Sequence, residues 1–348
     1  MQTFLDLLFQ SVTGGLFASS ILGLSSSVPV ATTTAPVIQL PVPVEYRLNT
    51  TPQYSLINPL IFIDTDQRLF PEYNSFDQEL HTYVKDIKSH ENINAVSIYF
   101  RDMNSGHWTG TNENELYEPG SMLKVAVLIA YERYAMEQSV LTKTTVQDVL
   151  SQQLYYSGAD ESGQYYTSTN PPLAPGMYSI QQLLDHMIID SDNSALLTLE
   201  KNQQDEFNSV YNDFRLPPSP TVQDEDFMTA KSYSVVFRSL FNGSYLTRSA
   251  SNQTLELLTQ TTFNDGLTAG IPDSTIQVAH KFGERTYQLS TGLVTGRELH
   301  DCGIVYYPSH PYFLCVMTKG TSDYPTLAHV IADISKMAYQ YVDMNAHK

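Results

Sequence analysis

A serine and a lysine stand three positions apart in the run Ser121-Met-Leu-Lys124, directly after Gly120. Residues i and i+3 of a helix lie on the same face, so this hydroxyl and this amine can contact each other. A serine hydroxyl becomes a nucleophile only when a neighbouring group removes its proton, and a serine in the first helical turn also offers an unpaired backbone N–H to an oxyanion. The apolar run from Val125 to Met136 can bury such a helix. The pattern therefore predicts a nucleophile on a rigid helical support.

Two later triplets decide how much weight the first motif carries. Ser-x-x-Lys is weak alone, because a chain of this length should contain it about once by chance, as a helix N-cap followed by a solvated lysine. Ser191-Asp-Asn193 follows an amphipathic stretch, and Lys281-Phe-Gly283 follows the strand-like run from Thr275 to His280. A given tripeptide arises by chance in roughly a few per cent of such chains. Three motifs in this order therefore indicate one catalytic site.

The three motifs, Ser-x-x-Lys, Ser-Asp-Asn and Lys-x-Gly, match a known set, that of class A β-lactamases and penicillin-binding proteins, whose third motif is Lys-Thr-Gly. Over residues 75–342 the chain resembles this family of penicillin-recognising serine hydrolases, with the class A branch nearest. The resemblance implies an acyl-enzyme on Ser121 and hydrolysis of a β-lactam or related amide. Two alternatives stay open: a D-Ala-D-Ala carboxypeptidase or transpeptidase acting on peptidoglycan, and a non-catalytic wall-binding pseudoenzyme that keeps the pocket.

The resemblance also implies four catalytic residues. Ser121 would attack an amide carbonyl, and Lys124, with its pKa lowered by burial, would take the serine proton. Ser191 would pass a proton to the departing nitrogen. Lys281 would supply positive potential for the proton relay and for a substrate carboxylate. No cofactor or metal is expected, because this chemistry needs none.

The same resemblance places the substrate-binding groups. Asn193 would hydrogen-bond the substrate's side-chain amide, and Gly283 would lie beside the substrate. The backbone N–H groups of Ser121 and Glu284 would form the oxyanion hole, in which one donor is typically worth about 3 kcal/mol. Asp192 is expected to cap its turn rather than to touch substrate.

Two departures from the family pattern bear on activity. Phe282 replaces the hydroxyl residue that normally helps to bind the substrate carboxylate, which predicts weaker affinity for penicillin-like acids. In the family a Glu-x-x-Leu-Asn motif in a loop after Ser-Asp-Asn supplies the deacylating glutamate, and no such motif follows Asn193 here. Glu225 is the preferred substitute, Glu118 is a minor candidate, and a solvated loop charge is the favoured interpretation for each carboxylate of the set Glu206, Asp213, Asp224, Glu225 and Asp226.

The order of elements predicts an α+β fold: an antiparallel five-stranded sheet flanked by helices, with an inserted all-helical lobe. Strands are expected at 95–100 and 107–109, and three more at 275–280, 301–307 and 311–318, the last two forming a hairpin that turns at 308–310. Helices are expected at 76–89, with a Ser75–Gln78 capping box, at 229–240 and at the C-terminus. The Tyr- and Pro-rich stretch 155–178 is interpreted as a surface loop rather than a border of the cleft, and His280 as structural.

Charge and composition narrow the partners. The net charge is −18, so nucleic acid and anionic membrane surfaces are poor partners. The family resemblance implies a small β-lactam or a cell-wall peptide as the substrate, and the chain is expected to be a monomer. The scattered histidines and two cysteines form no recognisable zinc motif. Cys302 and Cys315 fall nearly opposite each other in the predicted hairpin, where a disulfide and two buried thiols are equally compatible with the sequence.

The first 74 residues differ in composition from the rest of the chain. Residues 1–27 are apolar with small residues at the end, which predicts a signal peptide or weak membrane anchor, although no basic residue precedes Arg47. Residues 28–74, rich in proline at first, are expected to form a linker and N-terminal extension, and 75–348 the hydrolase domain. This organisation predicts an exported protein, either periplasmic, extracellular or anchored with its domain facing outward.

Overall fold

The computed structural model describes residues 45–47, 55–58, 60–63, 70–158, 164–216 and 226–346. The predicted signal or anchor segment 1–27 lies outside these ranges, as do Asp224 and Glu225. Within the described ranges, no helix is both long and apolar enough to cross a bilayer.

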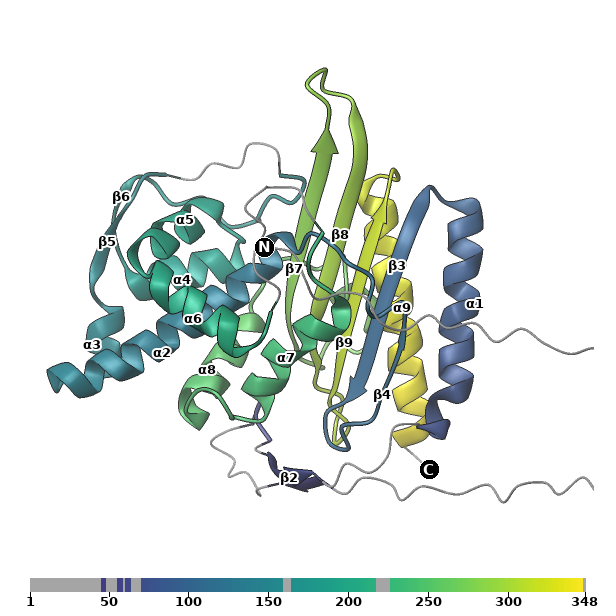
Figure 1. The fold of residues 1–348 in the computed structure, drawn as a ribbon, viewed down its shortest axis with the longest axis horizontal. Helices are drawn as coiled ribbons and strands as arrows, with labels where there is room; N and C mark the ends of the chain where they lie inside the picture. The colour runs from purple at the N-terminus through teal and green to yellow at the C-terminus, as the bar shows by residue number, and fades with distance from the viewer. Residues whose placement is uncertain are drawn as a thin grey trace, which may run out of the picture. The chain divides into compact units, whose positions relative to one another are not determined.

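A five-stranded antiparallel sheet divides the molecule, as predicted (Figure 1). Its spatial order is β4-β3-β9-β8-β7, so the first hairpin and the last three strands of the chain join through the β3–β9 pair. The strand bounds are β3 (Ile93–Asp102), β4 (Trp108–Thr111), β7 (Val278–Gln288), β8 (Val294–Val305) and β9 (Tyr312–Gly320). Buried apolar residues lie on both faces of this sheet, and the apolar runs are longest in β3 and β9.

The N- and C-terminal helices cover one face of the sheet, where Figure 1 shows them side by side. These are α1 (Asn74–His90), preceded by the 3₁₀ turn Pro71–Tyr73, and α9 (Tyr324–Ala346). The predicted capping box is wrong: the helix begins at Asn74, two residues before the expected start, so Tyr73 is its N-cap and makes no side-chain capping bond. The aromatic packing of Phe76 on Tyr341 holds the two helices together, with ring centroids 4.5 Å apart.

A mainly helical lobe packs on the other side (Figure 1). Its central helix is α2 (Lys124–Thr142), whose first two turns are surrounded on all sides: every residue from Val125 to Tyr131 is at most 2% exposed. The other helices are α3 (Val146–Leu150), α4 (Ile180–Ile189), α5 (Asn193–Asn202), α6 (Gln204–Asp213), α7 (Ala230–Phe241) and α8 (Arg248–Leu258).

The lobe is not all helical, which corrects the prediction. Strands β5 (Gln153–Tyr156) and β6 (Gly176–Ser179) form a two-stranded antiparallel ladder at the two ends of the stretch that was expected to be a loop. Each strand has only four residues, which is too short a pattern to distinguish a strand from a loop.

Two further features tie distant segments to the domain. Leu56 and Ile57, in the predicted N-terminal extension, are each 3% exposed in the core, and the Leu56 N–H donates to Asn252 Oδ1 over 3.0 Å. Nearby, β1 (Glu45–Arg47) pairs with β2 (Leu60–Ile63). Cys302 of β8 lies directly opposite Cys315 of β9, and the two form a disulfide, which decides between the two states that the sequence left open.

Candidate active site

The nucleophile lies on a 3₁₀ turn, Gly120–Leu123, that leads into α2. Gly120 has φ +53°, and a Cβ there would lie 2.7 Å from the carbonyl oxygen of Glu284. A Cβ on Gly283 would lie 2.1 Å from the carbonyl oxygen of Pro119. The turn and strand β7 therefore pack backbone to backbone, and this contact brings the main chain of Glu284 beside Ser121, where the expected oxyanion hole requires it.

Lys124 is the centre of the site. Its Nζ lies 2.9 Å from Ser121 Oγ, 2.7 Å from Asn193 Oδ1 and 3.1 Å from Ser191 Oγ, and it also contacts the Ser191 carbonyl. The side chain is fully buried. Burial, assisted by the positive charge of Lys281, lowers the pKa of Lys124 well below its usual value. A neutral amine in this position can accept the proton of Ser121.

Ser191 links the two lysines. Its backbone is in the left-handed region, with φ +59°, and its Oγ lies 3.0 Å from Lys281 Nζ as well as within reach of Lys124. Lys281 is also fully buried, and burial lowers its pKa to about 7 against the opposing charge of Asp301. All four predicted catalytic side chains thus meet in one cluster.

Asp192 and Asn193 begin helix α5, and they play different parts. Asp192 Oδ1 accepts hydrogen bonds from the N–H groups of Ser194 and Ala195, so it is the N-cap that the sequence predicted. Its other oxygen accepts from the Tyr156 hydroxyl over 2.6 Å. These bonds fix the start of the helix and turn Asn193 toward Lys124.

Residues Gln164 to Pro172, which we call the strap, reach from the helical lobe to the sheet. Gln164 lines the cleft with Ser121, and the backbone N–H groups of Tyr165 and Tyr166 donate to the Glu284 carboxylate over 2.9 and 3.2 Å. The interpretation of this stretch as a loop without a role at the cleft is therefore wrong. Burial of Glu284 raises its pKa, although these two donors act in the opposite direction. Sequence reasoning missed the strap because its contacts with Glu284 are made by backbone N–H groups, which leave no pattern in the sequence.

Phe282 packs into the core rather than into the cleft. It is 1% exposed and stacks on Phe263 at 4.3 Å between centroids, with Tyr166 of the strap edge-on at 4.8 Å. Lys281 Nζ lies 4.1 Å from the centre of its ring. The ring borders a cleft of about 180 Å³ that also contains Ser121 and Asn193, and it brings no hydroxyl to it.

Three of the candidate deacylating carboxylates that the structure describes are engaged in ion pairs away from Ser121, whereas Asp224 and Glu225 lie outside the described residues. Glu206 and Asp213 lie in α6, not in a loop as predicted, and both pair with Arg133. Asp226 pairs with Lys319, and the Glu118 carboxylate, whose pKa burial raises, does not line the described cleft. Among the described residues, no carboxylate forms a hydrogen bond with Ser121 or Lys124.

Two remaining expectations concern histidine and metal. His280 Nδ1 lies 2.8 Å from Asp301 Oδ1 with both side chains buried, in agreement with a structural role. In the ranges that the structure describes, no group of three or more His, Cys, Asp or Glu side chains is arranged to hold a metal ion.

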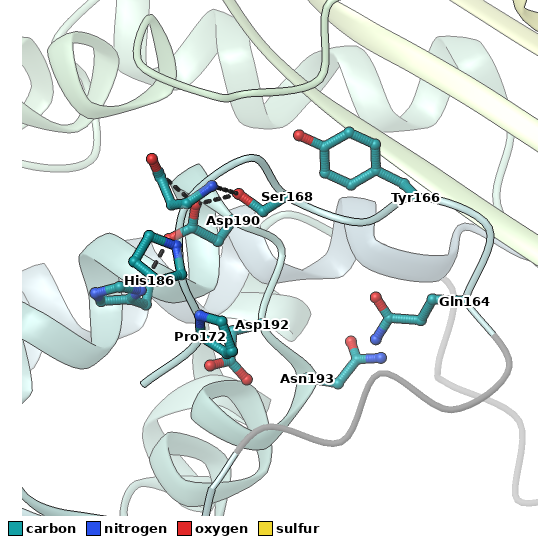
Figure 2. A pocket seen from close by; sticks show the side chains of 10 residues that line it. Gln164, Tyr166, Ser168, Pro172, His186, Asp190, Asp192 and Asn193 are labelled. Atoms are coloured by element: carbon teal, nitrogen blue, oxygen red, sulfur yellow. Dashed lines mark hydrogen bonds and ion pairs between the residues drawn. The ribbon is translucent and has the colours of Figure 1, made fainter. Parts of the chain in front are cut away.

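A smaller pocket adjoins the cleft on the far side of the strap (Figure 2). Figure 2 shows Gln164 near Asn193 at one end, with Ser168, Asp190 and His186 at the other. Asp190 accepts from the Ser168 hydroxyl over 2.6 Å and pairs with His186 over 2.8 Å. These bonds anchor the strap to the end of α4.

The fold is similar to several known structures over most of the chain. PBP-A matches with a TM-score of 0.59 at 18% identity, covering 78% of this chain and 97% of that chain, and a PBP-A mutant is known as an acyl-enzyme complex with penicillin G. The TLA-1 extended-spectrum β-lactamase matches with a TM-score of 0.61 at 16% identity, covering 78% of this chain and 99% of that chain. A β-lactamase from Sphaerobacter thermophilus matches with a TM-score of 0.60 at 16% identity, covering 77% of this chain and 97% of that chain.

Sequence comparison gives a direct assignment. Among curated proteins none matches the chain. The family model described as the beta-lactamase enzyme family matches residues 77–342, which is most of the chain and contains all three motifs. This match agrees with the five-stranded sheet and the cluster of two serines and two lysines described above. The chain belongs to the beta-lactamase enzyme family.

Proposed function

We propose that the protein is a serine hydrolase that forms an acyl-enzyme on Ser121 with a β-lactam or a related amide. The observation that carries this proposal is the buried contact of 2.9 Å between Lys124 Nζ and Ser121 Oγ, together with the lowered pKa of that lysine. A buried, neutral amine next to a serine on a rigid turn is the arrangement that nucleophilic catalysis needs.

The chemistry then follows in two steps. Ser121 Oγ attacks the carbonyl carbon while its proton moves to Lys124 Nζ, and backbone N–H groups of Ser121 and Glu284 stabilise the oxyanion. The carbon–nitrogen bond breaks as Ser191 Oγ gives its proton to the departing nitrogen, and Lys124 returns a proton to Ser191. Water then hydrolyses the ester, which releases the acid and restores Ser121.

A D-Ala-D-Ala carboxypeptidase or transpeptidase is the second candidate. It is favoured because, among the described residues, no carboxylate is hydrogen-bonded to Ser121 or Lys124, and Glu284, the acid that lines the cleft, accepts from the strap instead. Without such a base to activate water, the ester would persist, as in a penicillin-binding peptidase. The non-catalytic alternative is disfavoured, because Phe282 packs in the core and leaves the cleft open.

Intact-protein mass spectrometry with benzylpenicillin tests the proposal. We expect wild type to gain the mass of one penicillin and Ser121→Ala to gain none. A persistent adduct would support the peptidase, and an adduct that decays while penicilloate accumulates would support the β-lactamase. If neither an adduct nor penicilloate forms, acylation by β-lactams is excluded, and D-Ala-D-Ala peptide is the next substrate to assay.

We also propose that the protein is exported. The Cys302–Cys315 disulfide supports this, because structural disulfides persist mainly in oxidising compartments. The apolar residues 4–24 in the sequence supply a candidate export segment. Fractionation of cells that express the full chain should place it outside the cytosol, and recovery of only reduced, cytosolic protein would contradict the proposal.

A further inference from the structure

A second pocket, of about 460 Å³, lies inside the helical lobe between α2, α3, α4 and α8. These helices contact one another in pairs, and Figure 1 shows them on the lobe that carries the nucleophile. The described residues that line this pocket are different from those that line the catalytic cleft. The pocket therefore belongs to no part of the site already described.

The walls combine an apolar surface with uncharged polar groups. Leu128 of α2, Leu150 of α3 and Leu257 of α8 line the pocket and are at most 8% exposed. Gln181 of α4 and Gln253 of α8 also line it. A small organic molecule with an apolar body could therefore bury most of its surface here.

Glu132 of α2 is the ionisable residue that lines this pocket. Its side chain is 5% exposed, and its Oε2 is buried without a hydrogen-bond partner among the described residues. Asp185 of α4 is the other acid whose charge acts on Glu132, whereas the described residues that line the pocket from α3 and α8 are uncharged. Burial and the nearby Asp185 raise the pKa of Glu132 to about 7.

Thr254 of α8 supplies a second, independent observation. It also lines the pocket, it is 1% exposed, and its Oγ1 is buried without a hydrogen-bond partner among the described residues. Buried polar groups in folded proteins are nearly always hydrogen-bonded. Glu132 and Thr254 thus both line one pocket, and each has a buried oxygen atom without a hydrogen-bond partner among the described residues, which a donor group of a ligand would satisfy once the side chains turn toward it.

We propose that this pocket binds a small organic ammonium ion, whose N–H groups donate to Glu132 while its apolar body packs on the leucines. An ammonium group carries three donors and no acceptor, which suits a carboxylate and a hydroxyl oxygen. Two acids in the vicinity repel an anion, and the leucines offer no ligand to a metal ion. The proposal does not depend on the chemistry of Ser121, because Glu132 lies two turns along α2 from Lys124, about 12 Å away at 1.5 Å per residue.

The probe for this site is benzylammonium, and calorimetric titration of the full chain at pH 8 measures its binding. We expect saturable binding by wild type and at least a tenfold weaker affinity in Glu132→Gln. The matched control is Glu137→Gln, which removes a carboxylate from the same helix at a side chain that is 59% exposed, and should change the affinity less than twofold. Benzyl alcohol, the neutral analogue, should bind wild type and Glu132→Gln alike.

A second variant keeps the test independent of the charge. Gln253 is exposed at the rim, so Gln253→Trp should fold normally and block the probe by filling the pocket. Equal affinity of wild type and Glu132→Gln for benzylammonium would overturn the proposal, and so would the absence of saturable binding by wild type. Acylation of Ser121 by benzylpenicillin, measured on the same samples, reports separately on the proposed function.

Discussion

Lys124 acts as a base because of where its amine is buried. Four oxygen atoms of Ser121, Ser191 and Asn193 accept hydrogen bonds from it, and of these only the two serine hydroxyls can also donate a proton. None of these groups carries a full negative charge, so the cage does not offset the cost of burying an ammonium ion. The amine is therefore free to take a proton only when Ser121 gives one up.

Replacement of this amine should abolish acylation without unfolding the protein. Lys124→Met keeps the length of the side chain and removes the base, and the acylation rate should fall by about 10²–10⁴. Stopped-flow measurement with a chromogenic cephalosporin gives this rate. Lys201→Met, at an exposed position of α5, is the control and should acylate like wild type. Rapid acylation of the Lys124 variant would assign the base elsewhere.

Lys281 should make the acylation rate fall at alkaline pH. Its pKa is about 7, lowered by burial, so it loses its proton, and with it the positive charge at Ser191, as the pH rises through 7. The acylation rate of wild type should therefore fall above pH 7 in measurements from pH 5.5 to 9.5. Lys281→Met should react slowly without this alkaline decline. A wild-type rate that stays constant to pH 9 would show that the charge is not needed.

Glu132 should make the protein less stable as the pH rises. A folded-state pKa of about 7, against the ordinary 4.5, favours the native state below pH 4.5, and this contribution is lost between pH 4.5 and 7. Glu132→Gln should therefore match wild type near pH 4.5 and exceed it by about 2–3 kcal/mol at pH 8 in free energy of unfolding. Urea denaturation at both pH values measures this, with Glu137→Gln as the control. Equal stabilities at pH 8 would refute the assignment.

At the scale of elements, the strap joins the two sides of the cleft through backbone hydrogen bonds. The Glu284 carboxylate accepts from Tyr165 and Tyr166, and the Tyr165 ring stacks on Tyr324 of α9 at 4.4 Å between centroids. Strand β7 thus contributes its backbone to the nucleophile turn and a side chain to the strap. Strand β7 therefore positions both the nucleophile turn and the strap, which lie on the two sides of the cleft.

Removal of that carboxylate should loosen the strap. Hydrogen bonds to a charged acceptor contribute about 1.5–3 kcal/mol, so Glu284→Ala should raise amide hydrogen exchange at Tyr165 and Tyr166 by about 10- to 100-fold. Glu284→Gln keeps an acceptor oxygen and should have a smaller effect. Exchange followed by mass spectrometry resolves both amides, with the amides of β9 as an internal reference. Unchanged exchange in the alanine variant would mean that ring stacking alone holds the strap.

The elements that could be predicted from the sequence are those with a strong period or a fixed motif. Strands β3 and β9 and helices α2 and α9 bury long apolar runs, so their positions follow from local pattern. The strap and the β5–β6 ladder could not be predicted, because Tyr165 and Tyr166 are held by main-chain bonds to a residue 119 and 118 positions away. The start of α1 was misplaced because Ser75 looks like a cap, whereas Tyr73 fills the core.

At the scale of the whole molecule, the site joins three remote segments. Lys124 meets Ser191 across 67 residues, and Ser191 meets Lys281 across 90. The order of the three motifs predicts these contacts only through the family resemblance, because nothing local in the sequence shows that the segments lie together. Glu132 and Thr254 could not be singled out at all, since a pocket between four helices leaves no motif in the sequence.

Leu56 and Ile57 should matter to the stability of the whole molecule. Burial of an apolar side chain of this size contributes about 1.5–3 kcal/mol, so a chain lacking residues 1–69 should be less stable than one lacking residues 1–40 by about 3–6 kcal/mol. Chemical denaturation of the two shortened chains measures the difference. Equal stabilities would place the domain boundary after residue 69, in line with the predicted start at 75.

The contact between Phe282 and Tyr166 also limits how such a protein can change over evolutionary time. A mutation that restored a hydroxyl at position 282 would leave a gap beside Phe263 and remove the ring on which Tyr166 rests. Relatives with the aromatic residue at one position should therefore keep it at the other, and the two substitutions should be inherited together. A protein of this kind could therefore gain a hydroxyl that binds the substrate carboxylate only if the strap and strand β7 changed together.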